Sequence, residues 1–150
     1  EVDVMLRNQS DHLKPAAIWA PLIIRVVLGI IFMAHGAQKL FGAFDGGGIS
    51  GTAGFLGDLG LQPASFWAWV VALVEFFGGL AVFIGLLTGV AALLLVANMI
   101  VAMAAVHWSQ GFFAAQGGFE FPLALAAMAL SLVFSGPGVL SVDRYIRWRF

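Results

Sequence analysis

Cysteine and charge are what this sequence most lacks. It contains no cysteine, and only 10% of its 150 residues are charged, against about 25% in a typical soluble domain. Without cysteine the chain itself has no disulfide bonds, no thiolate metal ligands and no thiol–disulfide chemistry. The formal net charge of −1 provides no excess of basic groups for a phosphate backbone. We therefore expect no nucleic-acid partner.

Apolar residues make up 61% of the chain, and they gather in four runs at about 16–41, 66–87, 90–107 and 119–135. Roughly 20 helical residues cross the ~30 Å hydrocarbon core of a bilayer, and such runs can satisfy their backbone in lipid only as helices. We predict an all-α membrane protein: an antiparallel four-helix transmembrane bundle at 16–142. A flexible polar lead at 1–15 precedes it, and a basic aromatic tail at 143–150 follows.

The links between the runs differ in length. Only Thr88 and Gly89 separate the second run from the third, which predicts a tight antiparallel hairpin. The link from the first run to the second is long and rich in glycine. Within it, Thr52 could cap a short helix that ends near Gly60, lying in the membrane interface. An ordinary loop is the equal alternative.

Basic residues are distributed unevenly between the two ends of the predicted bundle. Loops on the cytoplasmic side carry the excess of lysine and arginine. With four spans, one side holds only Lys39, and the side of both termini holds the remaining basic residues: Arg7, Lys14, Arg144, Arg147 and Arg149. We expect a multi-pass membrane protein with both termini in the cytoplasm.

Two charged residues fall well inside predicted spans, Arg25 in the first and Glu75 in the second. An unpaired charge in lipid is costly, and an arginine side chain can bridge the difference in depth between these positions. We predict a buried Arg25–Glu75 pair. Glu75 could also act as a proton-exchanging carboxylate. Asn98, in the third run, is expected to anchor helices by a hydrogen bond.

A second group of polar residues lies toward the outer end of the bundle. His35 and Lys39 are spaced i, i+4 and share a helix face, His107 ends the third run and Glu120 opens the fourth. Together they are a candidate catalytic site for protons or quinone. Two imidazoles and a carboxylate could instead bind a divalent metal, and two histidines could ligate haem. Of the chemical roles we favour protons and quinone over metal or haem, and a purely structural role for these residues is the alternative.

The third run constrains this site. At about 100° per residue, Asn98 and His107 lie about 180° apart around an α-helix. They can face one site only if the helix bends. Glu120 also has a purely structural explanation, because a carboxylate at a helix N-terminus is favoured by the helix dipole.

In order along the chain, the motifs RVVLGIIFMAHGAQKLF, GTAGFLGDLGL, EFFGGLAVFIGLLT, AVHWSQGFF and QGGFEFPL resemble the DoxX family of small four-helix bacterial membrane proteins. The resemblance covers about residues 22–132. The family pattern carries onto the candidate residues above and onto a set of glycines. Of these matched residues, the resemblance implies a cofactor-binding role for His35, Gly36, Lys39, Gly117 and Gly118.

The resemblance implies a redox or quinone context, because the family is named for a subunit associated with terminal and thiosulfate-to-quinone oxidoreductases. We therefore expect a quinone-associated or redox-partner subunit of an oxidoreductase system. Its partners would be the lipid bilayer and other membrane subunits or soluble redox proteins, and its cofactor a quinone. The alternatives are a non-catalytic accessory subunit in a larger membrane complex and a small-molecule transporter.

Overall fold

The computed structural model describes residues 18–146, and all regular structure within that range is helical. Three helices, spanning 20–41, 64–84 and 88–110, are long and apolar enough to cross a membrane, whereas a fourth apolar helix has 16 residues. The prediction of an all-α membrane protein is therefore confirmed. The long elements are α2 (Ala20–Phe41), α4 (Ala64–Ile84), α5 (Thr88–Ala102) and α6 (Glu120–Ser135).

Shorter elements occupy the links. The π-helical turn η1 (Met103–His107) and the 3-10 turn η2 (Trp108–Gln110) extend α5, and η3 (Ala114–Gln116) precedes α6. The glycine-rich link contains α3 (Gly48–Asp58), and the described chain ends in α7 (Val142–Ile146). The predicted lead at 1–15 and the end of the predicted tail, 147–150, lie outside the described residues.

The short helix expected in the glycine-rich link is present as α3, but it begins at Gly48 rather than at Thr52. Thr52 does not cap it. Its hydroxyl donates to the Gly48 carbonyl at 2.8 Å, one turn back along the same helix. Leu56 is the buried residue of α3, whereas Phe55 is 49% exposed.

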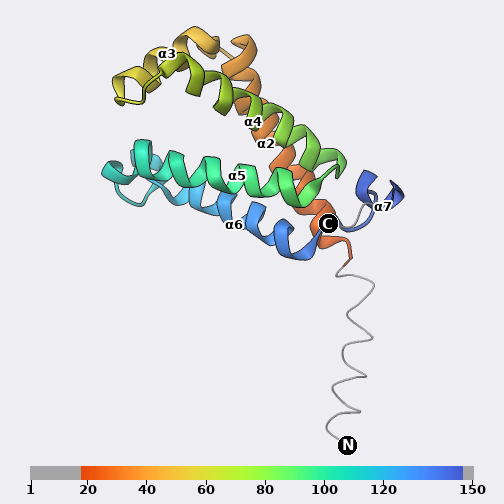
Figure 1. Cartoon of the computed structure of the whole chain (residues 1–150). Helices are drawn as coiled ribbons and strands as arrows, with labels where there is room; N and C mark the ends of the chain where they lie inside the picture. The colour runs from red at the N-terminus through yellow and green to blue at the C-terminus, as the bar shows by residue number, and fades with distance from the viewer. Residues whose placement is uncertain (1–17, 147–150) are drawn as a thin grey trace, which may run out of the picture.

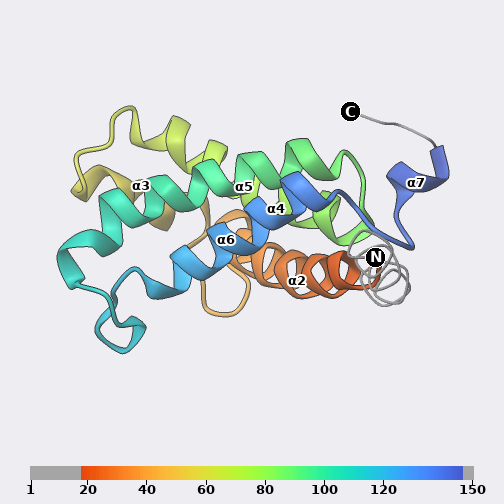
Figure 2. The same ribbon diagram turned by 90° about the horizontal axis from the view of Figure 1, so that it is seen from below.

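The long helices form two pairs. α2 packs mainly against α4, and α5 packs mainly against α6. The pairs lie close where α4 turns into α5 and diverge toward α3 and the 108–119 loop (Figure 1). Viewed after a quarter turn, the four helices run along a common direction, with α7 beyond one end and α3 near the other (Figure 2). We call these the closed end, at residues 85–88 and α7, and the open end, at α3 and residues 108–119.

Glycines allow α2 and α4 to approach closely. A Cβ atom added to Gly36 would lie 2.4 Å from the backbone nitrogen of Phe76, and one added to Gly79 would lie 2.8 Å from the backbone nitrogen of Met33. Helices in lipid associate through such small-residue contacts. The core between the pairs is built from buried side chains on all four long helices: Leu28, Phe32, Val82, Leu95, Leu125 and Leu132.

The turn between α4 and α5 is not at Thr88 and Gly89, as the sequence predicts, but at residues 85–87. Gly85 ends α4 in the left-handed conformation, with φ +73°, which is a common way for a helix to end. Leu87 follows with φ +46°. Thr88 and Gly89 therefore belong to the first turn of α5.

The closed end is held by Arg25. Its side chain is buried, and all five of its N–H groups donate to backbone carbonyls at 2.6–3.1 Å. Nε and one Nη2 hydrogen reach the last turn of α4, and the other hydrogens reach the segment that links α6 to α7. The accepting residues are Val82, Phe83, Pro137, Val139 and Leu140.

Asp143 completes the closed end. It is buried, although the sequence places it in a basic tail. Its carboxylate accepts the backbone N–H groups of Leu87 and Thr88, at 2.6 and 2.8 Å, and the Thr88 hydroxyl at 2.8 Å. A carboxylate at a helix N-terminus satisfies N–H groups that have no partner within the helix. α7 is thereby fixed to the start of α5.

Candidate functional site

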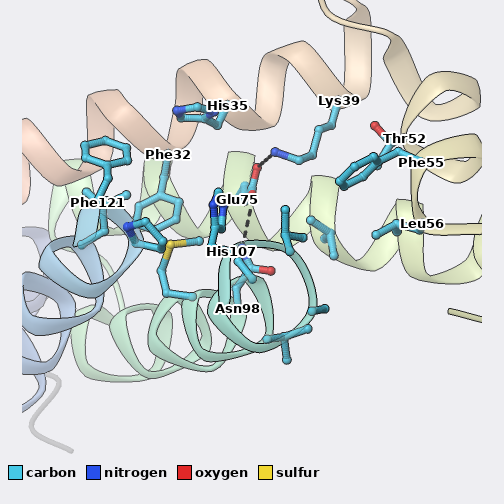
Figure 3. A pocket seen from close by; sticks show the side chains of 18 of the residues that line it. Phe32, His35, Lys39, Thr52, Phe55, Leu56, Glu75, Asn98, His107 and Phe121 are labelled. Carbon is cyan, nitrogen blue, oxygen red and sulfur yellow. Dashed lines mark hydrogen bonds and ion pairs between the residues drawn. The ribbon is translucent and has the colours of Figure 1, made fainter. Parts of the chain in front are cut away.

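A cavity of about 340 Å³ lies between the two helix pairs, toward the open end. α2, α3, α4, α5 with η1, and α6 all contribute to its walls. Most of the lining is apolar, and three helices each contribute an aromatic ring: Phe32 from α2, Phe55 from α3 and Phe121 from α6. The polar lining side chains are His35, Lys39, Thr52, Glu75, Asn98 and His107, and Figure 3 shows them around one hollow.

A chain of polar contacts crosses this cavity. Lys39 Nζ lies 2.5 Å from Glu75 Oε2, and Asn98 Nδ2 donates to Glu75 Oε1 at 3.0 Å (Figure 3). The Glu75 side chain is only 6% exposed, whereas that of Lys39 is 26% exposed. Asn98 therefore does join two helices by a hydrogen bond, as the sequence predicts. A buried carboxylate with a cation and an amide donor has both oxygens satisfied.

The predicted Arg25–Glu75 pair is wrong. Glu75 is bonded to Lys39 and Asn98, and every N–H group of Arg25 donates to a backbone carbonyl at the closed end. Val82, the first acceptor of Arg25, comes seven positions after Glu75 along α4, which is roughly 10 Å along a helix axis. The depth estimate from the sequence allowed an arginine to reach, but backbone acceptors were closer.

The two predicted histidines both line the cavity. His35 is exposed and projects from α2. His107 lies in the π-helical turn, which rotates less per residue than an α-helix and so brings His107 around toward the side of Asn98, and both line the cavity. The Nδ1 atom of His107 lies 2.6 Å from the Gly117 carbonyl oxygen. The loop after the π-helical turn thus sets the orientation of the ring.

Glu120 does not join the histidines. It is not among the cavity-lining residues, and its Oε1 accepts the Ala114 N–H at 2.7 Å. It therefore bonds within the loop between α5 and α6. In residues 18–146 no three side chains among histidine, aspartate and glutamate lie close enough together to hold a metal ion. The outer site consists of two imidazoles and the Lys39–Glu75–Asn98 chain.

None of the three glycines expected at the cofactor lines the cavity. Gly36 lies against Phe76 in the α2–α4 contact. Gly117 has φ +82° and offers its carbonyl to His107. A Cβ at Gly118 would lie 2.4 Å from the Gly111 carbonyl oxygen. These glycines shape the backbone that holds the site.

Sequence reasoning assigned Thr52 to a helix cap and Asn98 to helix packing, and it missed that both line the cavity. The signal for Asn98 was present, because an amide inside an apolar run requires a polar partner. Thr52 had no comparable signal, since its place depends on how α3 folds over the open end.

Comparison with known proteins identifies the family. The DoxX family model matches residues 20–108. "Putative oxidoreductase CatD" of Bacillus subtilis is 34% identical over 125 residues, which is 83% of this chain and 85% of that protein. "Uncharacterized membrane protein Rv3486" of Mycobacterium tuberculosis is 31% identical over 138 residues, covering 85% and 82%. "Inner membrane protein YqjF" of Escherichia coli is 28% identical over 127 residues, covering 83% and 90%.

No solved structure matches this chain. The family model covers more than half of the residues, and the first two relatives are similar over more than four-fifths of the chain. On these grounds, the protein is a membrane protein of the DoxX family.

Proposed function

We propose that this protein binds a quinone ring in the cavity between its helix pairs and serves as a quinone-associated or redox-partner subunit of an oxidoreductase system. The observation that carries the proposal is the Lys39–Glu75–Asn98 chain facing a mainly apolar cavity inside a bundle of membrane helices. Ionisable side chains in the interior of a membrane-helix bundle usually belong to functional sites. The printed name of one similar protein, "Putative oxidoreductase CatD", agrees with a redox role.

The residues present suit a quinone. A volume of about 340 Å³ lies at the lower end of the range for small-molecule sites, which are mostly apolar with a few placed polar groups. Quinone oxygens are hydrogen-bond acceptors. The Lys39 ammonium has three N–H donors, of which Glu75 engages one. The remaining donors and the aromatic walls can hold a polar, flat ring.

A bound quinone would supply the capacity to carry two electrons with two protons. The chain's own residues would bind, orient and exchange protons. Lys39 would hold a ring oxygen, and Glu75 would keep the ammonium in place. His35 and His107, nearer the open end, would pass protons between the cavity and the membrane surface. In this proposal a redox protein that docks on the membrane supplies the electrons.

The proposal includes an orientation. The basic residues favour cytoplasmic termini, and both ends of the described chain lie at the closed end, where the Val139 N–H bonds the Ile18 carbonyl. The open end would then face outward from the bacterial inner membrane. Labelling single cysteines introduced at Ser109 and at Tyr145 with a membrane-impermeant maleimide tests it: Ser109→Cys should react in intact spheroplasts and Tyr145→Cys should not. The reverse pattern would contradict the orientation.

Binding is tested with a matched pair of cavity variants. Ala105 and its neighbour Ala104 are both exposed, but only Ala105 lines the cavity. Purified protein in lipid nanodiscs is dialysed against a short-chain ubiquinone analogue, with empty nanodiscs as the blank. Ala105→Phe should abolish saturable binding, and Ala104→Phe should retain it.

Two outcomes would contradict the proposal: no saturable binding to the wild type, or binding to Ala105→Phe as tight as to the wild type. The first outcome, together with co-purification of larger subunits, would instead identify a non-catalytic accessory subunit. Quinone-independent flux of a solute in proteoliposomes would identify a transporter.

A further inference from the structure

We infer that the cavity prefers the reduced, hydroxyl-bearing form of an aromatic ring to the oxidised form. The inference rests on the proposed function and adds which redox form of the ligand the site retains. Its basis is an inventory of the polar atoms that line the cavity. Several of the donors already form hydrogen bonds within the protein, whereas most of the acceptors can still bond to a ligand.

His107 is the first case. A carbonyl oxygen can only accept a hydrogen bond, so the contact between His107 Nδ1 and the Gly117 carbonyl requires the proton on Nδ1. In the neutral ring Nε2 then carries the lone pair. Because His107 lines the cavity, the polar atom that it can offer to a ligand is an acceptor.

Thr52 repeats this pattern. Its single O–H is donated to the Gly48 carbonyl, so the hydroxyl oxygen can only accept from a ligand. The two residues come from different elements near the open end, Thr52 from α3 and His107 from the π-helical turn. Both are fixed as acceptors by backbone carbonyls, Thr52 by that of Gly48 in the same helix and His107 by that of Gly117 in the loop before α6.

Asn98 and Glu75 add further acceptors. Asn98 donates through Nδ2 to the carboxylate, which leaves its Oδ1 and one N–H. Each Glu75 oxygen accepts one bond and retains another lone pair. The fixed acceptors therefore come from four side chains, whereas the fixed donors are the Lys39 ammonium and the second Asn98 N–H. His35 can serve either way.

This balance discriminates between the two forms of one ring. A quinone has two acceptor oxygens and no donor, so it would leave the acceptors in the cavity without partners. A hydroquinone of nearly the same shape has two O–H donors, and its oxygens can still accept from Lys39. A ring that covers these acceptors without offering them a donor leaves them without a hydrogen-bond partner, so that form of the ring binds weakly. The preference thus follows from hydrogen-bond polarity and not from shape.

The experiment compares tetramethyl-1,4-hydroquinone with tetramethyl-1,4-benzoquinone, under anaerobic conditions, on wild-type protein in nanodiscs with empty nanodiscs as the blank. We expect the hydroquinone to bind at least tenfold more tightly. His107→Asn keeps a donor for Gly117 and removes the Nε2 acceptor, and Thr52→Val removes the hydroxyl at similar volume. Each should weaken hydroquinone binding by about 3- to 10-fold and quinone binding by less.

The control is Leu125→Met, an apolar change in the cavity wall, which should change both affinities by the same factor. Equal affinities, or tighter binding of the quinone, would overturn this inference while leaving the proposed function standing. Absence of binding for both rings would remove the proposed function and this inference together. A preference that survives both His107→Asn and Thr52→Val unchanged would show that these acceptors do not produce it.

Discussion

Arg25 and Asp143 hold the two sides of one turn. The guanidinium binds the carbonyls at the end of α4, and the carboxylate binds the N–H groups at the start of α5. Each charge therefore meets the pole of the helix dipole that attracts it. The two residues come from opposite ends of the described chain, so this turn fixes α2 and α7 to the central hairpin.

Replacing Arg25 with lysine should destabilise the fold although the charge is kept. Lysine has three donors and no planar fork, so at least two of the carbonyls now bonded by Arg25 would lose their partner, at ~1–3 kcal/mol each. We expect Arg25→Lys to lower the free energy of unfolding in mixed micelles by about 2–4 kcal/mol. The exposed Arg144→Lys is the control and should change it little. Equal stability of the two variants would refute the role assigned to the fork.

Asp143→Asn should weaken the attachment of α7. Asparagine retains one acceptor oxygen for the three donors at Leu87 and Thr88, and loss of a cap costs about 0.5–2 kcal/mol. The measurement is again unfolding in mixed micelles. Asp45→Asn is the matched control, because Asp45 is exposed and its φ of +59° suits asparagine. A loss as large in the control would mean that the cap is not the cause.

The Lys39–Glu75 pair should show strong coupling. Lys39→Met leaves a buried carboxylate without its cation, and breaking a buried pair costs about 3–5 kcal/mol. The double variant Lys39→Met with Glu75→Met should recover much of that loss, because no unpaired charge remains. A double-mutant cycle on unfolding free energies measures the coupling. Simple additivity of the two single changes would contradict the pairing.

Two glycine-to-alanine substitutions should change the stability of the protein in opposite directions. Gly36→Ala places a methyl group against the backbone of Phe76, and α2 must move away from α4, at about 1–3 kcal/mol. Gly54→Ala in α3 meets no atom within 4 Å and should gain about 0.5–1 kcal/mol from helix propensity. Thermal unfolding of both variants checks the pair. A harmless Gly36→Ala would mean that the helices are not in contact there.

The number and type of the long helices could be predicted from the sequence because lipid permits few backbone structures. The interhelical bond of Asn98 could be predicted for a related reason, since an amide in hydrocarbon needs a partner. Arg25 shows the limit of this reasoning. Its partners are backbone carbonyls, which every residue carries, so no residue type in the sequence reveals them.

Other parts of the site depended on local backbone geometry. An α-helical count puts His107 on the far side of its helix from Asn98, and only the π-helical turn brings both to the cavity. The loop between α5 and α6 engages Glu120 through the Ala114 N–H. A favourable charge at a helix start could be predicted, but the closer amide that binds it could not.

The bond between Glu75 and Asn98 joins the two helix pairs partway between the closed end and the open end. If the two helix pairs pivoted at residues 85–88, a small increase in the distance between Glu75 and Asn98 would produce a larger separation of the pairs at the open end. The position of Asn98 along α5 would then govern how wide a ring can enter. Moving that amide one turn toward the hinge would loosen the entrance and would also take a polar group out of the cavity wall.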